Sequence, residues 1–266
     1  MTDVYSCPVC GMAITPEHML TLEYKGFEYL LCSLPCKQSF QKHPDMYIHM
    51  DAERLNEKNM ELELVRKETI ACLSRAAEYK DNETGKHTMR IASYSQRLAE
   101  LAGLEDEHVE LIRETSPMHD VGKIGVPENI LLKQGALTPD ERSIIEQHPE
   151  IGAEILGRHS QSKLMKMAAI IAMNHHEKWN GEGYPGGLKA EEIPIEGRIV
   201  AICDVFDALI SVRPYKDAWP LDKIRDYFIT QHGEHFDPAL AKLFVQHFRD
   251  FHNIYNQLRD SGESHE

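Results

Sequence analysis

Histidine and carboxylate side chains recur after residue 80 in a pattern that could bind metal ions. They come as an adjacent His-Asp pair, an isolated histidine, an adjacent His-His pair and an aspartate within an apolar stretch. Such nitrogen and oxygen ligands can hold two ions about 3.5–4 Å apart, which polarise a phosphoryl oxygen and hold a hydroxide for in-line attack. The candidate ligands are Glu83, His87, His119, Asp120, His148, His175, His176 and Asp204.

Taken singly, these residues have ordinary explanations. Glu83 and His87 lie four residues apart and could pair on a solvated helix face, and His148 precedes a proline and could simply end a helix. Asp204 is harder to explain, because an unpaired carboxylate is costly within the apolar helix that AICDVFDAL predicts. Asp207, one turn later, is interpreted as structural, bonding a neighbouring helix. Mixed imidazole and carboxylate ligation suits Fe, Mn, Ni or Zn without selecting among them.

The His-His pair closes the helix that SKLMKMAAIIAMNHH predicts, and the glycine-rich EKWNGEGYPGGL follows at once. A helix that ends here can direct two imidazoles at one metal cluster. The loop then leaves room for a substrate, because glycine allows close backbone approach.

Four cysteines in the first 36 residues form a second candidate metal site. Two pairs of closely spaced thiolates can complete tetrahedral sulfur coordination of one ion, for which zinc is the expected metal. The alternative is four unrelated thiols. The ligands of this site are Cys7, Cys10, Cys32 and Cys36. Cys72 and Cys203 lie in apolar helical patterns and are interpreted as small core residues.

Three blocks must position these side chains. Residues 1–48 contain short strands, HMLTLEY and KGFEYLLC, around a Lys-Gly turn. Residues 49–80 lack Gly and Pro and predict one connecting helix. Residues 81–260 are helical throughout, with Gly103 as a C-cap and a capping box at Thr138, and two helices follow EGRIVAICDVFDALI. The fold is therefore mainly α, preceded by a small cysteine-rich α+β module.

The connecting helix carries an apolar stripe at mixed three-, four- and seven-residue spacings. We expect this stripe to pack on the following domain, with a short coiled coil that forms a homodimer as the alternative. The stripe consists of Leu55, Leu62, Val65, Thr69 and Leu73.

Net charge and hydropathy limit the partners. The formal charge is −14 over 266 residues, which disfavours nucleic acid and anionic membranes as partners. No apolar run approaches the roughly 20 residues of a membrane span, and no signal peptide is recognisable. We therefore expect a cytoplasmic protein, in which an anionic substrate would need local cations.

Residues 5–48 resemble the YHS (TRASH-like) metal-binding module in CPVCGM, YKGFEYLLCS and CKQSFQKHPDMY. The resemblance implies a small treble-clef-like fold that holds Zn²⁺ or another thiophilic metal. A sensing role and a structural role both stay open.

From about residue 80 to 250 the chain resembles the HD-GYP family, in MHDVGKIGVPENIL, QHPEIGAEIL, the long block from NHHEKWNGEGYPGGL to AICDVFDAL, RPYK and GEHFDP. The resemblance implies an HD-domain helical bundle and a metal-dependent phosphodiesterase. Members open cyclic di-GMP to linear pGpG, in some cases on to GMP, by attack of a metal-bridging hydroxide. A few act on the mixed cyclic GMP-AMP dinucleotide.

Carried over by position, the resemblance implies that Asp120 bridges two metals and that Glu83 with His87 recruits a third, with Fe or Mn expected. Lys123 matches the lysine that contacts the scissile phosphate or protonates the leaving oxygen. Basic residues after the Asp204 helix match positions that grip the substrate phosphates. These two are Arg213 and Lys216.

The Gly-Tyr-Pro segment at residues 183–185 is expected to brace the substrate groove or to engage a signalling partner. Tyr184 is a candidate to stack on a guanine base, although packing is the favoured role. Two other functions stay open: a non-catalytic cyclic dinucleotide receptor that reports metal status, and an HD hydrolase of other nucleotides. The complete ligand set favours the phosphodiesterase.

Overall fold

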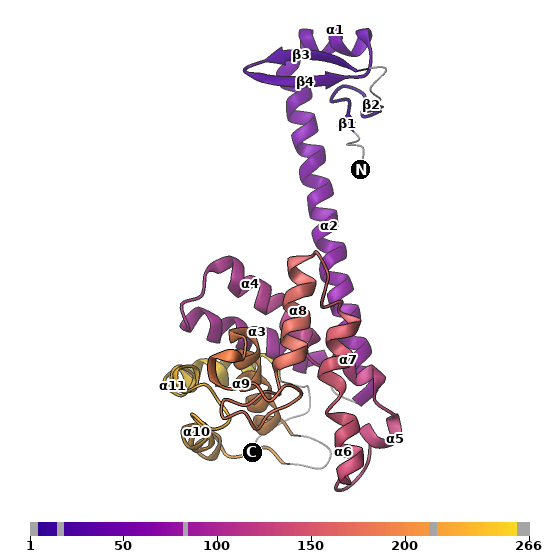
Figure 1. The fold of residues 1–266 in the computed structure, drawn as a ribbon. Coiled ribbons are helices and arrows are strands. Elements are labelled where there is room, and N and C mark those ends of the chain that lie inside the picture. The colour runs from indigo at the N-terminus through magenta and orange to yellow at the C-terminus, as the bar shows by residue number, and fades with distance from the viewer. Residues whose placement is uncertain (1–4, 15–18, 82–84, 213–216, 260–266) are drawn as a thin grey trace. The chain divides into compact units, whose positions relative to one another are not determined.

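The computed structural model describes residues 5–14, 19–81, 85–212 and 217–259. The chain forms two compact units, Met1–Arg66 and Lys67–Glu266, and the long helix α2 contributes residues to both. The ribbon in Figure 1 shows short strands in the first unit and helices throughout the second.

The elements of the first unit are β1 (Tyr5–Ser6), β2 (Ala13–Ile14), β3 (Leu20–Tyr24), β4 (Phe27–Leu31), α1 (Leu34–Lys42) and the start of α2 (Pro44–Asp81). The second unit contains α3 (Gly85–Leu101), α4 (Asp106–Thr115), the 3-10 helices η2 (Ser116–Met118) and η3 (Val121–Gly125), α5 (Glu128–Leu131), α6 (Pro139–Ile145), α7 (His148–Ile155), α8 (Lys163–Asn174), η4 (Ala190–Glu192), α9 (Ile195–Ile210), α10 (Leu221–Thr230), α11 (Pro238–Gln246) and α12 (Phe248–Leu258).

The hairpin β3–β4 forms where the sequence predicted it. Lys25 and Gly26 both have positive φ, 50° and 80°, so the two-residue turn matches the twist of the strands. Only a few side chains are buried in this unit, among them Leu31 and Phe40. A core this small depends on additional constraints, and a metal ion is one of the usual ones.

Helix α2 begins at Pro44, five residues before the predicted start. Of the predicted stripe, Leu73 packs against the core of the second unit, beside the buried Ile70 and Ala77. Leu62 and Val65 are 67% and 53% exposed, and Leu55 and Thr69 are exposed as well, so the packing prediction is wrong for these four residues of the stripe. Cys72 is also exposed, contrary to its interpretation as a core residue, because it lies beside the buried positions of the helix.

The core of the second unit surrounds α9, which packs against α3, α8, α10 and α11. Its sequence is apolar on nearly every side, and a helix of this kind has to be surrounded by others. Phe206 on α9 contacts Tyr94, Phe244 and Phe251 at ring-centroid distances of 5.1–6.3 Å. Cys203 is fully buried there, as predicted. Residues on α9 are therefore held rigidly, which is what a precise ligand site requires.

Several helix ends follow the predicted rules, and one prediction is wrong. Thr138 and Glu141 form the capping box of α6, and Gly103 has a φ of +76° just after α3. Three helices follow α9 within the described residues, where two were predicted. Asp237 caps the start of α11, accepting hydrogen bonds from the backbone N–H groups of Ala239 and Leu240.

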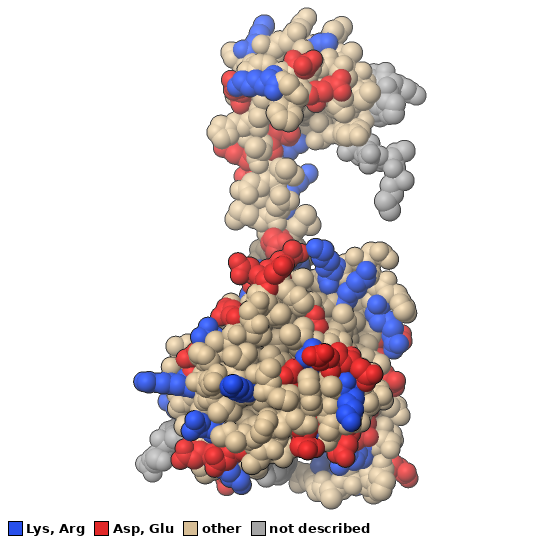
Figure 2. Space-filling view, turned by 60° about the vertical axis from the view of Figure 1, so that its left-hand side comes forward, with Lys and Arg blue, Asp and Glu red and all other residues tan. Residues whose placement is uncertain are grey.

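Charged side chains of both signs mix on the surface. On the face drawn in Figure 2, Lys and Arg side chains lie among Asp and Glu side chains rather than in one continuous basic area. Among the described helices, none is both long enough and apolar enough to cross a bilayer.

Candidate functional site

The candidate ligands come from five separate parts of the second unit. His87 lies in the first turn of α3, and Asp204 lies in the middle of α9. The HD pair, His119 and Asp120, occupies the turn between η2 and η3. His148 opens α7, and residues 175–176 follow the end of α8. His148 therefore begins a helix, so the alternative in which it merely ended one is wrong.

A close backbone approach joins two of these parts. A Cβ atom placed on Gly122 would lie 1.9 Å from the carbonyl oxygen of His148, so only glycine fits there. The approach of η3 to α7 brings the HD pair next to His148, and a larger residue would force the two elements apart.

Asp120 belongs to two groups of ligand atoms. Its carboxylate and one nitrogen each from His148, His175 and His176 lie within 4.8 Å of one another. The same carboxylate forms a second such group with His87 and His119. A carboxylate shared between two ligand groups has the placement of a residue that bridges two ions.

Three histidines are oriented by backbone carbonyls. His119 Nδ1 lies 2.9 Å from Ser116 O, His148 Nδ1 2.8 Å from Ile145 O, and His175 Nδ1 2.9 Å from Ala172 O. Since a carbonyl can only accept, each Nδ1 carries a proton, and in the neutral ring Nε2 is the lone-pair nitrogen that can bind a metal. The three Nε2 atoms lie 3.2–3.5 Å from the Asp120 carboxylate oxygens.

The polar atoms at the centre of this arrangement fit a metal ion. Nε2 of His119 and Oδ1 of Asp120 are fully buried and have no hydrogen-bond partner within the described part of the chain. Burying unpaired polar atoms is costly, and coordination of a cation would satisfy both. Nitrogen and oxygen donors without sulfur match the predicted metals.

Without an ion, charges within the cluster perturb one another. Burial alone would lower the pKa of His119, but the Asp120 carboxylate outweighs it and raises this pKa to about 9. Burial lowers the pKa of His175, and burial with the neighbouring imidazoles lowers that of His176 further. Lys123 Nζ lies 2.6 Å from Asp120 Oδ2. Burial would raise the pKa of Asp120, yet Lys123 and His119 hold it well below 3.8.

Asp204 lies beside these groups. Its Oδ1 is 3.8 Å from Nε2 of His119, and its side chain is 20% exposed. The carboxylate therefore faces the cluster from a buried helix while remaining accessible to solvent or substrate.

The Gly-Tyr-Pro loop folds onto the cluster. The Tyr184 ring stacks on His176 at 4.7 Å with an interplanar angle of 26°. Glu177, only 2% exposed, accepts hydrogen bonds from the backbone N–H groups of Gly186 at 2.6 Å and Leu188 at 3.0 Å. A Cβ on Gly183 would lie 2.3 Å from Lys178 N, so the loop needs glycine at this contact.

Some predicted site residues cannot be placed, and some contributing residues were not predicted. Glu83, Arg213 and Lys216 lie outside the described residues. Sequence reasoning missed Glu177, although an acidic residue directly between the His-His pair and a glycine-rich loop is a signal for anchoring that loop. It also missed Arg90, which contacts Asp207.

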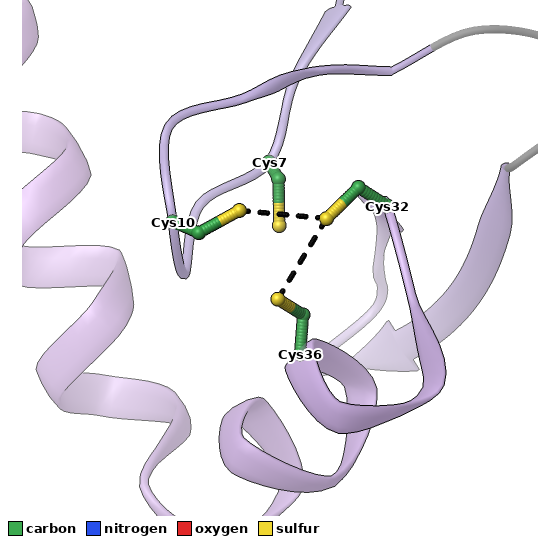
Figure 3. A group of neighbouring side chains, drawn as sticks. All are labelled: Cys7, Cys10, Cys32 and Cys36. Carbon is green, nitrogen blue, oxygen red and sulfur yellow. Dashed lines mark hydrogen bonds between the residues drawn. The ribbon is translucent and has the colours of Figure 1, made fainter.

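The four predicted cysteines lie together in the first unit, and Figure 3 shows their sulfur atoms pointing toward a common centre. Cys32 Sγ lies 3.4 Å from Cys10 Sγ and 3.7 Å from Cys36 Sγ. Four thiolates bound to Zn²⁺ at about 2.3 Å in a tetrahedron are separated by roughly 3.8 Å. All six cysteines of the chain are free thiols.

The thiols of this site differ in acidity. Burial would raise the pKa of Cys7, but hydrogen bonds from the backbone around Cys32, Cys10 and Val9 lower it to about 7. The hydrogen bond with Cys10, and next burial, raise the pKa of Cys32 to about 12. One thiolate therefore forms readily, and further deprotonation requires a cation to offset the repulsion between thiolates.

Comparison with known proteins places the chain in a family. Residues 71–240 match the model of the HD domain, and residues 6–50 match that of the YHS domain. The chain is 42% identical to the 3'3'-cGAMP-specific phosphodiesterase 2 of Vibrio cholerae over 89% of its own length and 45% of that protein. It is 45% identical to the cyclic di-GMP phosphodiesterase response regulator RpfG of Xanthomonas campestris, over 77% of the chain and 54% of that protein.

A third relative, the cyclic di-GMP phosphodiesterase of Thermotoga maritima, is 42% identical over 74% of the chain and 54% of that protein. The chain thus spans about half the length of these relatives. Among solved structures, a cyclic GMP-AMP specific phosphodiesterase of V. cholerae matches 73% of the chain and 51% of that structure with a TM-score of 0.54 at 18% identity, which supports the fold. With its mainly helical second unit and the family match over residues 71–240, the chain belongs to the HD domain family and carries a YHS domain before it.

Proposed function

We propose that the protein is a metal-dependent phosphodiesterase that hydrolyses cyclic di-GMP to pGpG. The observation that carries this proposal is the Asp120 carboxylate, which belongs to two groups of buried imidazole ligands at once. Relatives named cyclic di-GMP phosphodiesterases, at 42–45% identity, support the substrate.

A second candidate substrate is 3'3'-cGAMP, since a relative specific for it is 42% identical over most of the chain. Both substrates present the same phosphodiester to the cluster and differ in one purine. Selection between them would therefore depend on residues that contact the bases.

Divalent ions held by these ligands supply Lewis acidity and lower the pKa of water to near neutrality. The work of the chain is to orient the ligands and to balance charge. Asp120 holds a negative charge between the two ligand groups, and Lys123 provides a fixed cation beside it for the charge that develops on phosphorus or for the leaving oxygen. Arg213 and Lys216 are proposed to bind the substrate phosphates.

The metal complement and the partners are part of the same proposal. Two or three Fe or Mn ions occupy the HD site, with Glu83 and His87 serving the third, and one Zn²⁺ occupies the cysteine site. The exposed residues Leu62 and Val65 would support a homodimer along residues 49–80, which sedimentation velocity would detect. A signalling protein at the Gly-Tyr-Pro loop and a cytoplasmic location complete the proposal, and co-purification and fractionation would test them.

The deciding experiment measures turnover of cyclic di-GMP and 3'3'-cGAMP by anaerobically purified protein whose metals are counted. We expect Asp120→Ala to lose core metal and to lose activity by more than the roughly 10–100-fold that outer-shell changes cause. Its circular dichroism should stay helical, because Asp120 lies in a turn. Full activity in this variant would refute the site, whereas tight dinucleotide binding without turnover in metal-loaded wild type would favour a receptor.

A further inference from the structure

His87 differs from the other oriented histidines in what holds its ring. Its Nδ1 lies 2.8 Å from Oδ2 of Asp207, a carboxylate on α9, whereas the rings of His119, His148 and His175 bond backbone carbonyls. Since a carboxylate only accepts, the proton of the neutral ring sits on Nδ1 and Nε2 is the lone-pair nitrogen. His87 also forms a ligand group with His119 and Asp120.

Asp207 is itself held by Arg90. Arg90 Nε donates to Oδ1 of Asp207 at 2.6 Å, and Nη2 donates to Oδ2 at 2.9 Å, a two-point contact of planar groups. The guanidinium also contacts the hydroxyl of Ser211 at 3.3 Å and the carbonyl of Leu258 at 3.4 Å. The side chains of Arg90 and Asp207 are 3% and 2% exposed, so neither carboxylate oxygen can turn away.

Helix geometry explains why the four side chains meet. His87 and Arg90 lie three residues apart on α3 and therefore on one face, and so do Asp204 and Asp207 on α9. Because α3 packs along α9, His87 and Asp204 lie beside the metal-ligand groups, and one turn away Asp207 contacts both Arg90 and His87.

We propose that Arg90 and Asp207 are positioning residues that hold His87 for metal binding in the group it shares with His119 and Asp120. This inference rests on the proposed metal-dependent function. A carboxylate behind an imidazole fixes its tautomer and raises its basicity. The group of Asp120 with His148, His175 and His176 does not use this pair, so the effect is confined to one metal position.

The alternative is a buried ion pair that only stabilises helix packing. Both roles predict a less stable Asp207→Asn variant, because removing one partner leaves a buried charge uncompensated. They differ in metal binding. Asparagine keeps one acceptor oxygen and places an NH2 donor against either Arg90 Nε or His87 Nδ1. In either case the imidazole of His87 loses the negative charge behind it, and with it the basicity that this charge gives to Nε2.

The test is Mn²⁺ binding to the metal-free full-length protein, counted by electron paramagnetic resonance, for wild type, Asp207→Asn, His87→Ala and the double variant. We expect Asp207→Asn to weaken one class of Mn²⁺ site by about 10–100-fold. The double variant should bind no more weakly than His87→Ala, because both changes act through one ring. Unchanged Mn²⁺ affinity, or additive losses, would overturn the proposal.

Asp237→Asn is the matched control. Asp237 forms an ion pair with Arg198 at 2.6 Å, and the two side chains are 7% and 15% exposed. This largely buried ion pair therefore also links two helices. Its loss should lower the unfolding temperature without weakening any Mn²⁺ site. If Asp207→Asn does not fold, Arg90→Lys keeps the charge but loses the two-point contact, and unchanged Mn²⁺ affinity in that variant would overturn the proposal equally.

The tautomer gives a readout that is independent of activity. In metal-free wild type labelled with ¹⁵N-histidine, the ring of His87 should show protonated Nδ1. A wild type that binds Mn²⁺ but hydrolyses no cyclic dinucleotide would refute the proposed function. The Mn²⁺ affinities of the variants would still decide this inference. A ring of His87 with unprotonated Nδ1 in wild type would end the inference alone.

Discussion

At the scale of single residues, opposite charges stabilise one another within the buried ligand cluster. Asp120 stays ionised although it is buried, because Lys123 and His119 lie against it. Metal binding would take over the role of these cations, and Lys123 would then be available to a phosphate. This exchange explains why one lysine can belong to both the ligand cluster and the substrate site.

Lys123→Ala should lower turnover by about 100-fold or more while the metal content stays within error, because the lysine acts on charge that develops in the transition state. Steady-state kinetics and metal counting on the same preparation test this. Lys80→Ala is the control, since Lys80 contacts the carbonyl of Ile124 in the same 3-10 helix. Parallel loss of metal and turnover in Lys123→Ala would make the lysine structural.

His235 should make stability depend on pH. Burial, and next the charge of Lys178, lower its pKa to about 4, and Asp204 opposes them. Between pH 6.5 and 4 the unfolded chain binds a proton that the folded chain does not, so stability falls as pH falls in that window. The loss is at most about 3 kcal/mol. Urea unfolding of wild type and His235→Gln at pH 7 and pH 5 measures this loss of stability. An equal pH dependence of the unfolding free energy in the two proteins would contradict the prediction.

At the scale of elements, the metal cluster depends on how closely helices approach. The HD turn reaches His148 only because Gly122 lets η3 lie against the start of α7. Likewise, α9 must lie along α3 before Asp207 can contact His87. Ligand positions are thus set by backbone contacts as much as by the ligands themselves.

Gly122→Ala should lower the free energy of unfolding by about 1–3 kcal/mol, as overpacking does, and should also reduce metal content because it moves His148. Gly125→Ala is the matched control in the same element. A Cβ there would meet only the side chain of Ile151, at 2.9 Å, which can move aside. Denaturant unfolding with metal counting checks both, and equal behaviour of the two variants would show that the close approach to His148 has no special role.

At the scale of the whole molecule, the chain contains two candidate metal sites of different chemistry. The thiolates of the YHS unit suit a soft or borderline ion, and the nitrogen and oxygen ligands of the HD unit suit harder ones. The ligands of each unit therefore suit a different class of ion.

Cys7→Ser with Cys10→Ser should release the thiolate-bound ion, since it removes two of the four sulfur ligands, among them Cys7, whose pKa is lowered to about 7. Metal analysis before and after gel filtration measures the release. If turnover then stops responding to added metals that affected wild type, the YHS unit regulates the enzyme. If turnover is unchanged and the first unit merely unfolds at a lower temperature, the ion is structural. Full retention of the ion would contradict the assignment of the site.

Local rules predicted a large part of this structure from the sequence. The hairpin turn at Lys25–Gly26, the capping box at Thr138, the buried α9 and the four-cysteine cluster all depend on residues near one another in the chain or on strong spacing patterns. The candidate ligands were also recognisable, because ionisable residues within apolar helices are rarely tolerated without a partner.

Tertiary structure decided what connects distant residues. That Asp120 belongs to two ligand groups, that Tyr184 stacks on His176, and that Asp207 holds His87 from 120 residues away follow from helix packing, which no local pattern encodes. The sequence by itself determined which side chains could bind metal. Only the fold decided which nitrogen each histidine presents, because that choice depends on the carbonyl or carboxylate that packing places behind the ring.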